Sequence, residues 1–325
     1  MEDNQSTTPF SGTAKDSRIE AMRCAINNII IGQSWSVDLL LTAILANGHV
    51  LIEGVPGVAK TLSARLIAKL IDAKFSRVQF TSDIMPSDVL GTNVFNMGTK
   101  KFDFHAGPIF GDIILVDEIN RAPAKTQSAL FEVMEEKQAT IDGVRYPMSD
   151  IYTVFATQNP IEQEGTYRLP EAQMDRFMFK VVVGYPNADS ELEILRLHNS
   201  STAFSKLEAV SPILSHDDIL DLRQKAQNVH VDDKLMTYIV QIVAQTRQHQ
   251  NVYVAASPRA SIALLNSAKA YALINGRDFA IPDDVKMLAT PVLLHRISLT
   301  AEAEMNGVTI EQVVKGIINK VEVPK

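Results

Sequence analysis

Short apolar runs alternate with amphipathic segments through the first 184 residues of the chain. The runs are rich in β-branched and aromatic residues and are flanked by turn residues, as is typical of strands buried on both faces. Five such runs occur, at residues 49–53, 75–80, 112–117, 152–159 and 177–184. Buried strands separated by helical segments predict a parallel five-stranded sheet covered by helices on both faces, and therefore an α/β fold.

Two further segments of this half have the alternating pattern of β-hairpins. Residues 93–110 carry Gly98 and Gly107 among alternating polar and apolar positions. Residues 138–148 place Asp142 and a glycine between alternating residues, and Asp-Gly is a strong hairpin signal. We therefore expect two hairpins between the strands of the sheet.

After residue 189 the apolar positions recur only at helical spacing. Residues that typically start helices precede the first turns of these segments, at Ser215, Asp232, Ser257 and Pro282. Residues 17–46 are also helical, with a break at the sequence IIIGQ. The pattern predicts a flexible tail at residues 1–16, an α/β domain at 17–204 and an all-helical domain at 205–325.

The polar N-terminus has no basic region followed by an apolar one, so it does not resemble a signal peptide. No apolar run approaches the roughly 18 residues that a membrane-spanning helix needs. The single cysteine, Cys24, excludes an intramolecular disulfide and lies in a helical pattern, where we expect a buried structural thiol. These features together predict a cytoplasmic protein.

The formal net charge of -7 argues against a generally basic nucleic-acid binder. The first hairpin carries Lys100 and Lys101 but also Asp103, and the second balances Arg145 against Asp142. The seven histidines are scattered without the spacing of metal ligands, so no metal other than Mg²⁺ is expected.

The sequence GVPGVAKT follows the first strand and opens a helix, which is the layout of a phosphate-binding P-loop. Its residues are Gly54, Val55, Pro56, Gly57, Val58, Ala59, Lys60 and Thr61. Lys60 would reach the β- and γ-phosphates, and Thr61 would offer its hydroxyl to Mg²⁺. Ala59 replaces the glycine of the general pattern, and its methyl group could fit a backbone that is not left-handed.

A second motif, IILVDEINRA, ends an apolar strand with Asp117 and Glu118. Asp117 would hold Mg²⁺ and Glu118 would polarise the attacking water. Such a run alone is common, but about 60 residues after a P-loop it indicates an ATP site. A third motif, FATQNP, places Asn159 at the carboxyl edge of the sheet, where it could orient water or be a plain loop residue.

Two arginines are further candidates. Arg176, in LPEAQMDRF, lies just before the last strand and could instead form a surface ion pair with Asp175 or Glu171. Arg259, in ASPRA, lies in the first turn of a helix, where a cation opposes the helix dipole. An anionic ligand would explain Arg259, although a plain surface arginine remains open.

In this order the five motifs resemble those of AAA+ ATPases, and within them the MoxR family, whose P-loop also has alanine before lysine. VDEINRAP, ATQNP, LPEAQMDRF and SPRA are similar to that family's Walker B, sensor 1, arginine-finger and sensor 2 segments. The stretch with Ile31 and Gly32 resembles the one that packs near adenine. The hairpins resemble the helix-2 insertion and the pre-sensor-1 hairpin of the wider clade.

The resemblance implies a role for each candidate. Lys60, Thr61 and Asp117 would bind ATP and Mg²⁺, Glu118 and Asn159 would act on the attacking water, and Arg176 would act on the ATP of a neighbouring subunit. ATP would also bridge the sheet domain and the helical lid through Arg259.

At the level of the assembly, the resemblance implies a homo-oligomer, usually a hexameric ring. Its task would be the chaperone-like remodelling or maturation of a client enzyme, alongside a von Willebrand factor A domain protein. Two alternatives remain open, a nucleic-acid-stimulated motor and an ATP-binding switch with little hydrolysis, although Glu118 argues against the switch.

Overall fold

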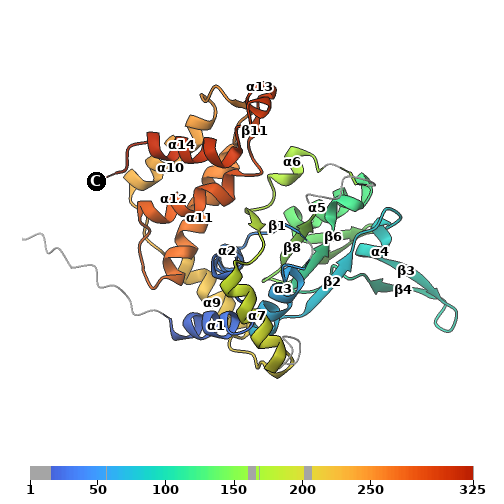
Figure 1. Ribbon diagram of the computed structural model, residues 1–325. Coiled ribbons are helices and arrows are strands. Elements are labelled where there is room, and N and C mark those ends of the chain that lie inside the picture. Colours follow the sequence, from blue (N-terminus) through green and yellow to red (C-terminus); the bar gives the residue numbers. More distant parts are fainter. Residues whose placement is uncertain (1–15, 56, 160–165, 168, 201–206, 325) are drawn as a thin grey trace, which may run out of the picture.

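The computed structural model describes residues 16–55, 57–159, 166–167, 169–200 and 207–324. The expected tail, apart from Asp16, lies outside the described residues. Pro56 and the expected domain boundary after residue 204 lie outside them as well. The described chain forms a sheet with its covering helices, followed by a helical part that packs beside it (Figure 1).

A parallel five-stranded sheet forms the centre of the first part, which confirms the predicted α/β fold. Its strands are β1 (Val50–Gly54), β2 (Phe75–Gln79), β5 (Ile113–Asp117), β8 (Thr153–Gln158) and β9 (Phe179–Val183). Their order is β2-β5-β8-β1-β9, so that β1, β8 and β5 are neighbours. Because neighbouring parallel strands end at the same edge, the loops after β1, β5 and β8 meet there.

Successive side chains of β1 enter different apolar clusters. Val50 and Ile52 belong to one cluster and Leu51 to the other, as the alternation of a strand requires. The helices of this part are α1 (Ser17–Asn27), α2 (Ser34–Leu45), α3 (Lys60–Leu70), α4 (Pro86–Leu90), η1 (Ile119–Arg121), α5 (Ala124–Glu136), α6 (Glu171–Met174) and α7 (Ala188–Ser200). The middle of the sheet is therefore buried on both faces, which explains the nearly continuous apolar runs of β5 and β8, whereas the edge strand β2 is mostly polar and partly exposed.

Both predicted hairpins are present. The first consists of β3 (Gly91–Asn96) and β4 (Lys101–Ala106), and the second of β6 (Gln138–Ile141) and β7 (Val144–Pro147). The first hairpin projects from the side of the α/β part (Figure 1). Phe104 stacks on Tyr146 with their ring centroids 4.2 Å apart, so the two hairpins also contact each other.

The second part of the described chain, called the lid, is mainly helical. Its helices are α9 (His216–Gln227), α10 (Asp233–Thr246), α11 (Pro258–Ile274), α12 (Pro282–Leu293), α13 (Ala301–Met305) and α14 (Ile310–Lys320). Of these, α9, α10, α11 and α12 start at the predicted positions. The side chains of Ser215, Asp232 and Ser257 accept backbone N–H bonds at the starts of α9, α10 and α11. The lid also contains two short antiparallel strands, β10 (Val252–Val254) and β11 (Ser298–Leu299), which helical periodicity did not predict.

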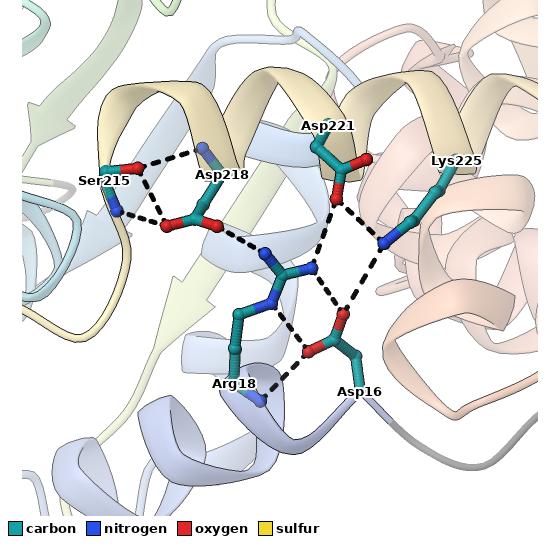
Figure 2. A network of polar contacts seen from close by, with 6 residues as sticks. All are labelled: Asp16, Arg18, Ser215, Asp218, Asp221 and Lys225. Carbon is teal, nitrogen blue, oxygen red and sulfur yellow. Dashed lines mark hydrogen bonds and ion pairs between the residues drawn. The ribbon is translucent and has the colours of Figure 1, made fainter.

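The first helix is joined to the lid by a network of charged side chains (Figure 2). Arg18 of α1 pairs with Asp16 at 2.7 Å and also contacts Asp218 and Asp221 of α9. Lys225 pairs with Asp221 at 2.8 Å. This network therefore links the beginning of the described chain to the beginning of the lid.

Cys24 is exposed, so the expectation of a buried thiol is wrong. The buried face of α1 consists of Ile19, Met22 and Ile26, and Cys24 falls on the opposite face. Among the described residues no helix is long and apolar enough to cross a membrane.

Candidate functional site

The P-loop joins β1 to α3 through two left-handed residues. Gly57 has φ +86° and Ala59 has φ +58°, so the expectation that Ala59 would avoid the left-handed region is wrong. Ala59 precedes α3, and its carbonyl accepts bonds from the N–H and hydroxyl of Ser63, at 2.9 and 3.1 Å. This helix start is therefore reached through a conformation that costs a non-glycine residue about 1 to 2 kcal/mol.

Close contacts hold the loop in place. Lys60 Nζ donates to the Gly54 carbonyl at 2.5 Å, and Gln33 Nε2 donates to the Val58 carbonyl at 3.0 Å. A Cβ at Gly54 would lie 2.6 Å from the Val183 carbonyl of β9, so only glycine fits there. Gln33 is the last residue of the stretch IIIGQ that was assigned to the adenine side, but it was not among the predicted site residues.

That stretch is a turn between α1 and α2, and it contains Ile31 and Gly32. Gly32 has φ +75°, and a Cβ there would lie 2.7 Å from the Ser190 hydroxyl of α7. The glycine therefore permits both the turn and the close approach of α7 beside the P-loop.

Asp117 ends β5 and is buried, with 6% of its surface exposed. Its Oδ2 accepts a hydrogen bond from Arg77 Nε of β2 at 2.6 Å, and its Oδ1 accepts one from Thr157 Oγ1 of β8 at 3.1 Å. The carboxylate is thus fixed by both neighbouring strands. Neither partner was singled out in the sequence.

Glu118 follows in a left-handed conformation, with φ +59°. Its backbone N–H donates to Thr157 Oγ1 at 3.0 Å, so one hydroxyl holds both acidic residues of this motif. Its carboxylate pairs with Arg121 at 2.9 Å. Thr157 could have been identified from the sequence, because it is a hydrogen-bonding residue two positions before Asn159 and residues at this spacing share a face of a strand.

Asn159 directly follows β8 and is buried, with 8% of its surface exposed. Glu53 of β1 is in register with Gln158 of β8, which places Asn159 beside the start of the P-loop. The structure therefore gathers the P-loop, Asp117, Glu118 and Asn159 at one edge of the sheet. An ammonium, a hydroxyl, carboxylates and an amide at a helix N-terminus are groups that fit a nucleoside triphosphate with Mg²⁺, and Thr61 and Asp117 could hold the metal.

Arg176 and Arg259 lie at the opposite edge. Arg176 precedes β9, where the Met178 N–H donates to the carbonyl of His49, the residue before β1. Both guanidinium groups pair with Glu135 at the end of α5, at 2.9 Å for Arg176 and 2.6 Å for Arg259. The partner foreseen for Arg176 was Asp175 or Glu171, and the structure gives Glu135 instead.

A cavity of about 460 Å³ lies beside these arginines. Its lining includes Asn47, His49, Glu135, Arg176, Arg259 and Arg296. Five residues of β1 separate this edge from the P-loop, which corresponds to about 13 Å of strand. In this arrangement Arg259 lies beside Glu135 and Arg176, at the edge of the sheet away from the P-loop of its own chain.

The lid is anchored beside Arg176. Asp175 pairs with Arg296 at 2.7 Å and accepts a bond from the Ser257 hydroxyl at 2.9 Å. Arg296 also donates to the Phe177 carbonyl at 2.6 Å, and His295 Nε2 contacts the same carbonyl at 2.8 Å. Burial lowers the pKa of His295 well below its ordinary value, so the ring is neutral and Nε2 carries the proton that it donates. These contacts from the lid fix the backbone that carries Arg176.

Comparison with known proteins agrees with this geometry. Residues 49–179 match the model of the ATPase family associated with various cellular activities (AAA), and residues 244–317 match that of the AAA lid domain. A crystal structure of a candidate ATPase from Cytophaga hutchinsonii has 42% sequence identity and a TM-score of 0.88, covering 95% of this chain and 96% of its own. The fold and its P-loop edge thus define an AAA+ ATPase.

Relatives narrow the class further. Chaperone MoxR1 of Mycobacterium tuberculosis is 43% identical over 309 residues, 92% of this chain and 81% of its own length. The YeaC protein of Bacillus subtilis is 48% identical over 299 residues, 92% of each chain. Protein MoxR of Paracoccus denitrificans is 28% identical over 311 residues, 88% of this chain and 90% of its own length. The chain belongs to the MoxR family of AAA+ ATPases.

Proposed function

We propose that this protein is an Mg²⁺-dependent ATP hydrolase whose active sites form between the subunits of a homo-oligomeric ring. The observation that carries the proposal is the separation of the two halves of the site. The P-loop, Asp117 and Glu118 lie at one edge of the sheet, and Arg176 and Arg259 lie at the other. An arginine edge can reach a P-loop only in another copy of the chain, so both arginines would act on the nucleotide of a neighbour.

Each residue at the P-loop edge has a separate task in this proposal. Lys60 and the loop N–H groups would hold the phosphates, and Thr61 and Asp117 would hold Mg²⁺, which when bound neutralises charge on the phosphate oxygens. Glu118 would orient the attacking water and accept its proton, assisted by Asn159. Thr157 would keep Asp117 and Glu118 in place, because its hydroxyl contacts both residues.

The work driven by hydrolysis would be the chaperone-like remodelling of partner proteins. The name of Chaperone MoxR1, a relative at 43% identity, supports this task. The hairpin of β3 and β4 also exposes large apolar side chains, those of Val94, Phe95, Met97 and Phe102. Exposed apolar groups on a projecting element suit contact with a polypeptide better than with a phosphate backbone.

Two variants test whether the site is shared. Lys60→Ala should abolish nucleotide binding, and Arg176→Ala should keep binding but lower turnover by about 10³-fold, because an arginine supplied by a neighbour typically contributes 10³ to 10⁵. Mixing the two inactive proteins should restore turnover, since a Lys60→Ala subunit still offers its arginine edge to the intact P-loop of an Arg176→Ala subunit. Steady-state phosphate release from the mixture measures this.

The exposed Arg196 of α7 provides a control, and Arg196→Ala should hydrolyse ATP at the normal rate. An Arg176→Ala protein with near-normal turnover, or a mixture as inactive as its components, would contradict the shared site. Stimulation of the ATPase by DNA that falls with rising salt would favour a nucleic-acid motor instead.

A further inference from the structure

Glu135 lies in the last turn of α5, and its single carboxylate pairs with both Arg176 and Arg259. The edge of the sheet that carries these two arginines is called the arginine edge. Oε2 pairs with Arg176 at 2.9 Å, and Oε1 pairs with Arg259 at 2.6 Å. We propose that Glu135 is a positioning residue that holds Arg176 and Arg259 side by side, so that they meet the phosphates of a neighbouring subunit as one unit. This inference rests on the proposed function, because it concerns the arginine half of the shared site.

The two arginines come from different parts of the chain and would otherwise repel each other. Arg176 precedes β9 of the sheet, whereas Arg259 lies in the first turn of α11 in the lid. A third cation, Arg296, lines the same cavity, and its pKa is lowered by burial and also by repulsion from Arg259. The Glu135 carboxylate between Arg176 and Arg259 offsets the repulsion between these two arginines. The three groups together keep a net positive charge.

The arginines keep donors for an incoming anion. Arg176 Nη1 donates to the Phe131 carbonyl, and its guanidinium carbon lies 6.0 Å from the centre of the Phe131 ring. Its Nε is buried and has no hydrogen-bond partner among the described residues. The Arg176 side chain as a whole is 28% exposed and that of Arg259 is 51% exposed, so other guanidinium N–H groups can donate to a phosphate oxygen brought by the neighbour.

The exposure of the Glu135 and Arg259 side chains indicates that their ion pair orients the arginine more than it stabilises the fold. The Glu135 side chain is 37% exposed, and that of Arg259 is 51% exposed. Ion pairs at such exposure contribute little to folding, because solvent screens them. Loss of Glu135 should therefore change the direction in which the arginines point much more than it changes the stability of the subunit.

Glu135→Gln is the sharpest substitution because it keeps the size and shape of the side chain. A glutamine has one acceptor oxygen, and its NH₂ group would face the second guanidinium as another donor. One of the two arginines therefore loses its partner. Glu136→Gln is the matched control, because Glu136 is the next residue of α5 and is also an exposed glutamate.

The experiment uses mixtures of the full-length chain in which one subunit type supplies the arginine edge and the other supplies the P-loop. Glu135→Gln placed on the Lys60→Ala subunit should lower the restored turnover at least about tenfold. The same substitution on the Arg176→Ala subunit should change it less than about twofold, because that subunit contributes only its P-loop. Glu136→Gln should have no effect in either position.

The melting temperature of the Glu135→Gln subunit should stay within about 3 °C of its parent. Glu135→Asp keeps two acceptors on a shorter arm, so it should lower turnover less than Glu135→Gln does. Equal loss in both positions, no loss in either, or a larger drop in melting temperature would overturn the positioning role. A parental mixture without Glu135→Gln that stays inactive would instead overturn the shared site, and this inference with it.

Discussion

At the scale of single residues, the P-loop combines two kinds of requirement. Gly54 is needed for space, because a Cβ there would meet the Val183 carbonyl at 2.6 Å. Gly57 is needed for conformation alone, because its φ is +86° while a Cβ there would meet nothing within 4 Å beyond its neighbours in the chain. Ala59 has the conformation of a glycine without being one, at φ +58°. The loop therefore stores a small strain at the start of α3.

This strain predicts opposite results for two substitutions of Ala59. Ala59→Gly relieves the left-handed strain but increases the entropy of the unfolded chain, so the free energy of unfolding should stay within about 1 kcal/mol of wild type and nucleotide binding should persist. Ala59→Val adds a β-branched side chain to a left-handed position and should abolish binding. Urea unfolding and the affinity for a fluorescent ATP analogue measure both effects. A valine variant that binds normally would contradict the assigned backbone.

Residues of the site that adjoin in sequence could be predicted, and their partners could not. Lys60, Asp117 and Glu118 belong to short motifs whose residue types and spacing predict phosphate and Mg²⁺ binding. Arg77 and Thr157 contact Asp117 from neighbouring strands 40 residues away in either direction. Such contacts depend on the strand order and register of the sheet, which local periodicity does not encode.

At the scale of secondary structure elements, the network of Figure 2 makes α1 part of the interface with the lid. Arg18 contacts three carboxylates, and its hydrogen bond is the main reason why the pKa of Asp16 is lowered. Because these groups are partly exposed, their joint contribution depends on how well counterions screen them.

Arg18→Ala should therefore destabilise the protein in a salt-dependent way. We expect the melting temperature to fall by about 2 to 4 °C at low ionic strength, because three carboxylates lose their shared cation. The difference should shrink in 0.5 M salt, a concentration that reduces the Debye length to roughly 4 Å. Lys315→Ala, at an exposed position of α14, is the control and should change little. A salt-independent loss would point to packing of the arginine stem instead of charge.

The strands, hairpins and helix starts followed from sequence because each has a long or chemically specific pattern. β10 and β11 escaped prediction because strands of 3 and 2 residues are too short to show alternation. The exposure of Cys24 was not predicted, because the sequence pattern of a short helix whose two faces differ little in polarity does not show which face is buried. Arg259 was placed correctly at a helix start, but the direction in which the lid packs could not be read from periodicity.

At the scale of the whole molecule, two buried neutral histidines, His49 and His295, form hydrogen bonds that stabilise the edge of the sheet carrying Arg176 and Arg259. His49 Nδ1 accepts from the Val154 N–H at 3.0 Å, so the ring donates from Nε2 to the Met134 carbonyl at 3.1 Å. Burial lowers its pKa from the ordinary 6.5 to about 4. His295 is buried neutral in the same way between the lid and the sheet.

These histidines predict a loss of stability in mild acid. In the unfolded chain His49 takes up a proton below pH 6.5, whereas in the folded chain it stays neutral down to about pH 4. The stability that depends on neutral His49 is therefore complete above pH 6.5 and is lost as the pH falls from 6.5 to 4. From pH 7.5 to 5 the free energy of unfolding should fall by about 2 kcal/mol through His49, with His295 adding in the same direction. Urea titrations measure this, and His49→Gln should flatten the dependence. An unchanged slope in that variant would assign the effect to other groups.

The proposed shared site, with its two halves on opposite edges of the sheet, also limits which assemblies could be active. A two-fold dimer uses the same patch on both subunits, so it could complete its sites only if that one patch carried both the P-loop edge and the arginine edge. Where the two edges lie on different faces, head-to-tail contacts join the P-loop edge of one subunit to the arginine edge of the next, and a linear row of such contacts ends in one unused P-loop and one unused arginine pair. Closure of the row removes both loose ends. For the proposed shared site, activity per subunit should therefore depend on the length and closure of the row, and the last subunit to join a ring should complete two sites at once.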